Sequence, residues 1–296
     1  AYVVALVNRG KALAGLGRFE EALASVRKGR ELDPMNPRAW RKEGEILSAL
    51  GRIDESHRCY DRSLELDPNQ PALLERKGDD LSALGSYLEA NRCYDEASRL
   101  DPRYVRPLVK KGNNLLDLGR IDEGLRCYDD AVVLDPGEEY AWGSKSIALA
   151  KLEQYPEALA CLDQIEAINP KSFDLWRQRA EIFLSMGGIK DALAAAERAI
   201  ELTPDFAQGW KIKGEALLIL GCFGEAAQSF SKAILLDPKD HRSWASKGQA
   251  LASMKYMEGA LSCFEKALDL APAECSLWFQ RGECEDTLGR SREAAA

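Results

Sequence analysis

Residues 58–68 read RCYDRSLELDP, and nearly the same letters return at 92–102 as RCYDEASRLDP and at 126–136 as RCYDDAVVLDP. A cysteine beside a tyrosine and an aspartate, written three times, has two interpretations. It is either a chemical site, such as a metal or redox centre, or a packing unit that the chain reuses. The spacing of the whole chain decides between the two.

Proline ends each copy and keeps one spacing through the sequence. No insertion breaks this register, which is the signature of a tandem-repeat protein. Four residues after the tryptophan position comes a small residue, most often glycine. The prolines recur every 34 residues, at 34, 68, 102, 136, 170, 204, 238 and 272. All six tryptophans lie six residues after such a proline, at 40, 142, 176, 210, 244 and 278.

Each repeat is predicted to fold as two helices. In the second repeat, PRAWRKEGEILSALG places Trp40 and Gly44 at helical spacing, and Gly51 supplies the stop. Residues 53–66 then carry a second apolar stripe that ends at Pro68. All prolines fit helix ends or first turns, where a missing N–H does little harm. No segment alternates with period two for long enough to be a strand, so the fold class is all-α.

The motif of Trp, Gly four residues on, an aromatic residue or Ile in the turn, then Ala, Tyr or Phe, Ala and Pro resembles the tetratricopeptide repeat across essentially the whole chain. The resemblance implies a right-handed α-α superhelix, or solenoid, of about nine 34-residue helix-turn-helix repeats in a single domain over residues 1–296. The first helix of each pair then lines the concave face. The repeats are expected to start at 3, 37, 71, 105, 139, 173, 207, 241 and 275, the last one incomplete.

The ninth repeat departs from the pattern. Glu285 stands where other repeats have Leu or Phe, and Ser291 stands where most have an aromatic residue or Ile. We expect such changes in a terminal repeat with a polar outer face.

The repeat register also answers the question of the cysteines. The position of Cys59 is filled by a small residue in every repeat, as a steric slot requires and as a metal ladder does not allow. A buried free cysteine behaves as a small apolar residue, so we predict a packing role. Eight cysteines without a CxxC motif fit a reducing compartment, and a cytoplasmic location is expected. The other occupants of the slot are Ser25, Cys93, Cys127, Cys161, Ala195, Ser229 and Cys263.

Composition excludes several classes of function. The formal net charge is −8, which argues against nucleic acid as a general partner because phosphate binding needs a positive field. No apolar run approaches the roughly 18 residues of a membrane span, so no membrane partner is expected. The opening AYVVALVNRG lacks the basic region of a signal peptide, and the absence of an initial methionine indicates a piece of a longer chain.

Catalysis is not expected either. The only two histidines, His57 and His241, fall in different repeats, which leaves no His-centred triad or zinc site. No glycine-rich phosphate loop is present, and carboxylates sit mostly in first helical turns, where they offset the helix dipole. We therefore predict a non-enzymatic chain with no cofactor and no metal.

The predicted function is a protein–protein interaction scaffold that binds a peptide or protein segment in its concave groove. In the family, ligand-facing side chains lie at the second, fifth, sixth, ninth and twelfth to thirteenth positions of the first helix. Six cations at such positions form a basic cluster in the N-terminal half, which makes an acidic or C-terminal segment a candidate partner. The residues expected to bind it are Arg38, Arg41, Lys42, Arg76, Arg106, Lys110, Asn113, Tyr140, Arg177 and Lys211.

Three alternatives stay open at this stage. In the first, the inner face binds no ligand and is simply solvated, with local ion pairs to Glu45, Glu75 and Asp79, since runs of charge usually serve solvation. In the second, the chain self-assembles into a homo-oligomer through its incomplete ninth repeat. In the third, it forms the adaptor region of a larger multidomain enzyme. The family's carboxylate clamp is not supported, because Val109 and Ser144 stand where the clamp has Lys and Asn.

A column of basic residues stands one residue before the small position, with Glu43 as the exception. Acids recur on the second helices, and we expect inter-helix pairs such as Lys111 with Asp95 or Asp129. The basic column comprises Arg9, Lys77, Lys111, Lys145, Arg179, Lys213, Lys247 and Arg281.

Overall fold

The computed structural model describes residues 2–289, which contain 17 helices and no strand. They fall into two compact units divided between Ser144 and Lys145, inside one helix. Residues 290–296 lie outside the described residues, and with them Ser291 and the expected second helix of the ninth repeat.

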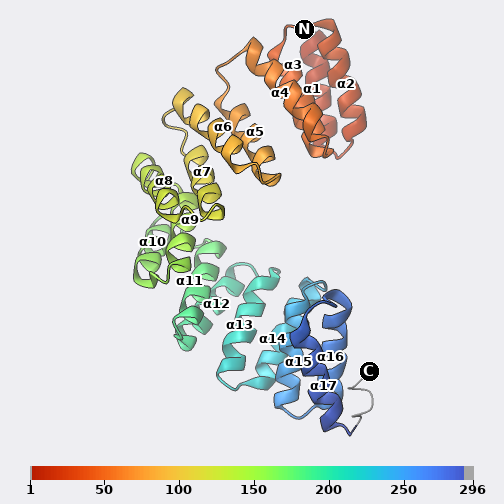
Figure 1. Ribbon diagram of the computed structural model, residues 1–296, viewed down its shortest axis with the longest axis vertical. Coiled ribbons are helices and arrows are strands. Elements are labelled where there is room, and N and C mark those ends of the chain that lie inside the picture. The colour runs from red at the N-terminus through yellow and green to blue at the C-terminus, as the bar shows by residue number, and fades with distance from the viewer. Residues whose placement is uncertain (1, 290–296) are drawn as a thin grey trace. The chain divides into compact units, whose positions relative to one another are not determined.

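The first unit holds eight helices and the beginning of a ninth, as consecutive pairs (Figure 1). Three of the first helices, α3, α5 and α7, each pack on their own partner and on the second helix of the preceding pair, so that α3 contacts both α2 and α4. The bounds are α1 (Tyr2–Gly15), α2 (Phe19–Leu32), α3 (Pro37–Ala49), α4 (Ile53–Leu66), α5 (Pro71–Ala83), α6 (Tyr87–Leu100), α7 (Arg106–Asp117), α8 (Ile121–Leu134) and α9 (Glu139–Lys151).

The second unit repeats the same arrangement, and Figure 1 shows α13 to α17 side by side toward the blue end of the chain. The prediction of an all-α chain of tandem helix pairs is confirmed. The remaining bounds are α10 (Tyr155–Ile168), α11 (Phe173–Ser185), α12 (Ile189–Leu202), α13 (Ala207–Ile219), α14 (Phe223–Leu236), α15 (His241–Ser253), α16 (Met257–Leu270) and α17 (Cys275–Thr287).

In five repeats, the glycine of the first helix lies against an aromatic ring of its partner helix. A Cβ atom added to Gly44 would lie 2.5 Å from two ring carbons of Tyr60, which is fully buried. Gly78 stands in the same relation to Tyr94, again at 2.5 Å. A close-packed interior has no space for the extra atom, so the small residue sets how closely the two helices approach.

The residues in the cysteine slot serve in packing. Cys59 is 5% exposed, and burial raises the pKa of its thiol to about 12, which keeps it protonated and unreactive. Burial also raises the pKa of the thiols of Cys93 and Cys127, which are partly buried. Ser25 fills the same slot and donates a hydrogen bond of 3.0 Å to the carbonyl of Leu6. All eight cysteines are free, so the slot joins no helices covalently.

The conserved spacing between proline and tryptophan has a hydrogen-bonding reason. The indole Nε1 of Trp40 donates to the carbonyl oxygen of Pro34 at 2.8 Å, and each of the other five tryptophans makes the same bond six residues back, at 2.8–3.1 Å. The aspartate before the proline caps the same loop. Asp101 Oδ1, for example, accepts from the backbone N–H of Arg103 at 3.1 Å.

The expected inter-helix ion pairs form between a first helix and the second helix of the preceding repeat. Lys111 of α7 lies 2.6 Å from Asp95 of α6, which confirms the first of the two predicted partners. The same spacing of sixteen residues joins Lys77 to Asp61, Arg179 to Asp163 (2.7 Å) and Lys213 to Glu197 (2.8 Å).

Glu285 does not lie on a polar outer face, so that expectation was wrong. Its side chain is only 3% exposed and forms an ion pair of 2.7 Å with Arg281, one turn earlier in α17. The guanidinium offsets the cost of burying the carboxylate, which explains why an acid replaces Leu or Phe here.

Candidate functional site

Four of the six predicted cations of the N-terminal half are already paired. Lys110 lies 3.0 Å from Glu75 and 2.5 Å from Asp79, on the preceding first helix α5. Arg106 approaches Glu75 at 3.8 Å, and the hydroxyl of Tyr104 donates to the same carboxylate. The structure therefore compensates much of the charge that the sequence placed on this face.

Of the remaining four cations of this half, two form ion pairs and two are exposed without a partner. Arg41 lies 3.8 Å from Glu45, whose carboxylate also receives a hydrogen bond from Lys42. The side chains of Arg38 and Arg76 are exposed and have no ion pair or hydrogen bond within residues 2–289. These two are the cations that remain available to an incoming ligand.

The first helices α5, α7 and α9 frame a cavity of about 350 Å³ in the first unit, which we call the Tyr140 cavity. It brings together three of the predicted residues, Lys110, Asn113 and Tyr140. The amide of Asn113 is held on both sides. Its Oδ1 accepts from Tyr128 at 2.6 Å, and its Nδ2 donates to the hydroxyl oxygen of Tyr140 at 2.8 Å. The other lining residues are Asp79, Ser82, Ala83, Tyr87, Tyr94, Asn114 and Asp117.

The Tyr140 cavity has hydrogen-bond donors left over. The Lys110 ammonium carries three N–H groups, of which one donates to Asp79, while Glu75 Oε1 lies 3.0 Å away as an ion pair without a hydrogen bond. The Asn113 amide has two N–H groups and uses one, and the Tyr140 hydroxyl accepts a bond and keeps its own proton to donate. The cavity can therefore receive a group that accepts several hydrogen bonds.

A second cavity of the first unit, about 340 Å³, brings Arg38 and Arg41 together where α5 begins. Asp67, Asn69 and Gln70 also line it. The Nε atom of Arg41 is buried and has no hydrogen-bond partner among the described residues. We call this the Arg41 cavity.

In the second unit, the predicted cations are engaged within the chain. Arg177 pairs with Asp174 at 3.2 Å and with Glu181 at 2.8 Å, both on its own helix. Lys211 pairs with Asp240 at 3.0 Å. These contacts hold both cations in place on their first helices.

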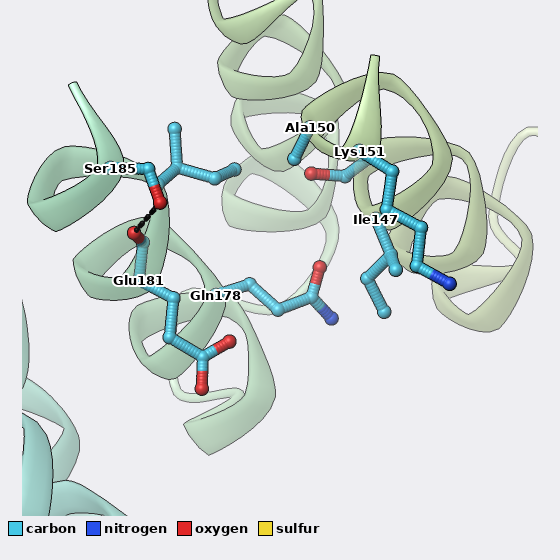
Figure 2. A pocket seen from close by; sticks show the side chains of 8 residues that line it. Ile147, Ala150, Lys151, Gln178, Glu181 and Ser185 are labelled. Atoms are coloured by element: carbon cyan, nitrogen blue, oxygen red, sulfur yellow. Dashed lines mark hydrogen bonds between the residues drawn. The ribbon is translucent and has the colours of Figure 1, made fainter. Parts of the chain in front are cut away.

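Next to Arg177 lies a cavity of about 240 Å³ between α9 and α11, which we call the Gln178 cavity (Figure 2). Sequence analysis missed Gln178, although it occupies the sixth position of its first helix, one of the ligand-facing positions. The register alone could have found it, but the search favoured charge. The lining residues are Ser146, Ile147, Ala150, Lys151, Gln178, Glu181, Ile182 and Ser185.

Within residues 2–289, no three His, Cys, Asp or Glu side chains cluster as metal ligands. Over the same residues, every helix is too short or too polar to cross a membrane.

Comparison with known proteins gives the family. A family model described as tetratricopeptide repeat matches residues 7–71, 109–173 and 177–241, and a second model of the same description matches 241–274. No curated protein matches the sequence.

Solved structures share the fold at low sequence identity. Yeast Tom70 has a TM-score of 0.71 at 17% identity, over 93% of this chain and 60% of that one. A tetratricopeptide repeat protein from Parabacteroides merdae has a TM-score of 0.66 at 17% identity, over 84% and 99%. The APC/C hetero-tetramer Cut9-Hcn1 gives 0.66 at 17% identity, over 94% and 55%. The present chain thus spans less than two thirds of the chains matched in Tom70 and Cut9-Hcn1.

The family models cover well over half of the residues, in the register of the observed helix pairs. The chain therefore belongs to the tetratricopeptide repeat family, whose members are typically non-catalytic protein-interaction scaffolds.

Proposed function

We propose that the chain binds a peptide or protein segment on the first helices of its first unit, and that the Tyr140 cavity receives a carboxylate of that segment. The observation that carries the proposal is the set of three unused donors on Lys110, Asn113 and Tyr140 around one cavity. A carboxylate accepts several hydrogen bonds and donates none, so it matches that set.

The cavity is pre-organised for such a ligand. Tyr128 fixes the Asn113 amide, and two carboxylates fix Lys110, so little side-chain entropy is lost on binding. Asp117 also lines the cavity and has no ion pair within residues 2–289, so the lining carries two carboxylates, Asp79 and Asp117, beside the single cation Lys110. We therefore expect one acidic side chain or a C-terminus to enter, rather than a run of acids.

Exposed Arg38 and Arg76 supply positive charge outside the cavity. Their side chains have no partner among the described residues, so they remain able to attract an acidic segment over the screening length of about 8–10 Å. Such charges on a rim raise the association rate more than the affinity.

The test compares two neighbouring lysines of α7. A pool of random peptides of about ten residues is screened by fluorescence polarisation, once with free C-termini and once amidated. For the peptides selected by the unmodified protein, we expect Lys110→Gln and Asn113→Leu to weaken binding about 5–20-fold, because each removes hydrogen bonds to a charged group. Lys111→Gln removes the same charge outside the cavity and serves as the matched control.

The two lysine variants also decide against the proposal if it is wrong. Equal losses in Lys110→Gln and Lys111→Gln point to a diffuse electrostatic effect, with no specific role for the Tyr140 cavity. Selected peptides that bind equally well to all three variants remove the cavity from the binding surface altogether.

A further inference from the structure

The carboxamide of Gln178 is buried in the second unit without a hydrogen bond. The residue is 7% exposed, and its Oε1 atom is fully buried with no partner. Neither polar atom of the carboxamide bonds to another residue in the described part of the chain. A buried acceptor without a donor costs about 1–3 kcal/mol, and most native proteins satisfy such atoms. An unsatisfied acceptor that lines a cavity indicates a ligand that supplies the donor.

The hydroxyl groups of the cavity cannot supply it. Ser146 donates its proton to the carbonyl of Ala158 at 3.0 Å. Ser185 donates to the carbonyl of Glu181 at 3.1 Å, as the dashed line in Figure 2 marks. Because each hydroxyl has a single proton, neither can also donate to Gln178.

The carboxylate on the same helix is also occupied. Glu181 receives a hydrogen bond of 2.8 Å from Arg177 and one of 3.2 Å from Gln208. A carboxylate accepts hydrogen bonds only, so it offers nothing to the Oε1 atom of Gln178. The hydroxyl and carboxylate groups around the cavity are thus committed elsewhere. Lys151 also lines the cavity, but its ammonium group makes no hydrogen bond to Gln178, so the Gln178 carboxamide is left over.

Apart from Lys151, the rest of the cavity lining is apolar, and the space is small. Figure 2 shows the Gln178 side chain extending from α11 toward α9, where Ile147 and Ala150 lie. Ile147 is 42% exposed, and Ile182 on α11 adds a buried apolar wall. At about 240 Å³ the space is below the roughly 300 Å³ of the smallest drug-sized pockets, which favours a short segment with a small side chain.

The chemistry of the free carboxamide selects the ligand. Oε1 requires a donor, and Nε2 offers a donor to an acceptor. A peptide group carries one N–H and one C=O and can pair with a carboxamide through two hydrogen bonds. A carboxylate lacks the donor and an ammonium group lacks the acceptor.

We propose that the Gln178 cavity binds one peptide group of an extended main chain, with a small apolar side chain against Ile147 and Ile182. This deepens the proposed function and rests on it, because it assigns a contact to the main chain of a bound segment. The Gln178 cavity would bind the main chain of the segment, whereas the Tyr140 cavity would bind a carboxylate.

The experiment uses the full chain and a capped tri-alanine peptide, acetyl-Ala-Ala-Ala-amide. A matched peptide carries an ester in place of the central amide, which removes one N–H and little else. Binding is followed by NMR, through the Gln178 side-chain amide and the methyl groups of Ile147 and Ile182. We expect these signals to shift, with the ester binding about 5–10-fold more weakly, as the loss of one hydrogen bond of about 1–1.5 kcal/mol implies.

Two variants separate a ligand role from a structural one. Gln178→Leu keeps the size and removes the buried unsatisfied oxygen, so we expect an unchanged or higher melting temperature together with loss of the shifts. Asn113→Leu removes a donor of the Tyr140 cavity and should leave the shifts unchanged, so failure of the proposed function is seen separately.

Either of two results overturns the inference. The unmodified protein shows no shifts with the amide peptide, or it binds the ester equally well. Both comparisons use the native chain, so they hold even if Gln178→Leu fails to fold.

Discussion

Glu43 of α3 accepts a hydrogen bond of 2.8 Å from the Nε atom of Arg27, sixteen residues earlier in α2. Arg30 approaches the other carboxylate oxygen at 3.3 Å. In the other ion pairs of this spacing, the first helix carries the cation and the second helix the acid. In the Glu43–Arg27 pair, the first helix carries the acid and the second helix carries the cation. The exception in the basic column is therefore the same contact with reversed polarity.

Loss of Arg27 should cost more than loss of Glu43. The Glu43 side chain is 3% exposed, so Arg27→Met leaves a buried carboxylate with only Arg30 nearby, and we expect a loss of about 2–3 kcal/mol in unfolding free energy. Glu43→Gln removes the buried charge as well and should cost about 1 kcal/mol. Urea unfolding of both variants measures the difference. Equal costs would show that Glu43 is protonated or solvated in the folded chain.

The Lys111–Asp95 pair should contribute far less. Its side chains are 27% and 55% exposed, so solvent screens the attraction and we expect Lys111→Glu to cost about 0.5–1 kcal/mol. Exchanging both residues, Lys111→Asp with Asp95→Lys, should recover most of that loss. The recovery should shrink in 1 M salt, where the screening length is about 3 Å. A double exchange that recovers nothing at low salt removes the pair from the determinants of register.

The fold was readable from the sequence because every repeat must solve the same packing problem. A Cβ on Gly44 or Gly78 would collide with the facing tyrosine ring, so the small position had to recur. The tryptophan had to stay six residues from the proline to reach its carbonyl, as Trp40 does at 2.8 Å. Constraints of this kind are local to one repeat, and a single sequence displays them many times over.

The candidate site was readable only in part, because its state depends on side chains of neighbouring helices. Lys110 was expected on the ligand-facing surface, but its pairing with Glu75 and Asp79 depends on how α5 and α7 pack. Gln178 was missed because a neutral amide has no signal in a search for charge. Its importance appears only when the hydrogen bonds of the hydroxyl groups around it are known.

Substitution by glycine in two turns should increase the stability of the chain. Glu153 and Lys255 have φ values of 60° and 64°, in the left-handed region that side chains disfavour. The equivalent residue in the other seven repeats is glycine, with φ between 73° and 78°. We expect Glu153→Gly and Lys255→Gly to raise the unfolding free energy by about 0.5–1 kcal/mol each.

The matched control for these turns is Gly119→Ala, which introduces a side chain at φ 73° in open space. It should lower the unfolding free energy by about 1 kcal/mol, since the strain of a side chain at positive φ outweighs the entropy that alanine removes from the unfolded chain. Thermal unfolding by circular dichroism measures all three variants. A loss of stability in Glu153→Gly would mean that the glutamate side chain contributes more than the strained backbone costs.

Two successive helix-pair junctions use the same three positions with different chemistry. In one, Ser48 donates to Asp80 Oδ1 at 2.8 Å, and His57 Nε2 lies 3.8 Å from Asp80 Oδ2. One repeat later, 34 residues on, Ser82 donates to Asn114 at 2.6 Å, and Asn114 donates to Asn91 at 3.1 Å. The second junction is neutral, and hydrogen bonds link its three side chains. The first can titrate, and its facing His57 and Asp80 atoms have no hydrogen bond.

Stability should therefore fall as the pH is lowered from 7.5 toward 5.5, with His57 as the cause. Burial lowers the pKa of His57, against the opposing charge of Asp80 and with a smaller contribution from Lys77 in the same direction as burial. The unfolded chain then binds the proton more tightly than the folded chain. The contribution of His57 is complete above its ordinary pKa of about 6.5 and is lost as the pH falls through its lower, folded value.

His57→Asn together with Asp80→Asn copies the neutral junction of the next repeat and should flatten this dependence. The measurement is the urea midpoint at several pH values, with the His57 ring signal followed by NMR. If the midpoint rises on acidification, the proton is bound more tightly in the folded chain, and the His57–Asp80 attraction outweighs burial.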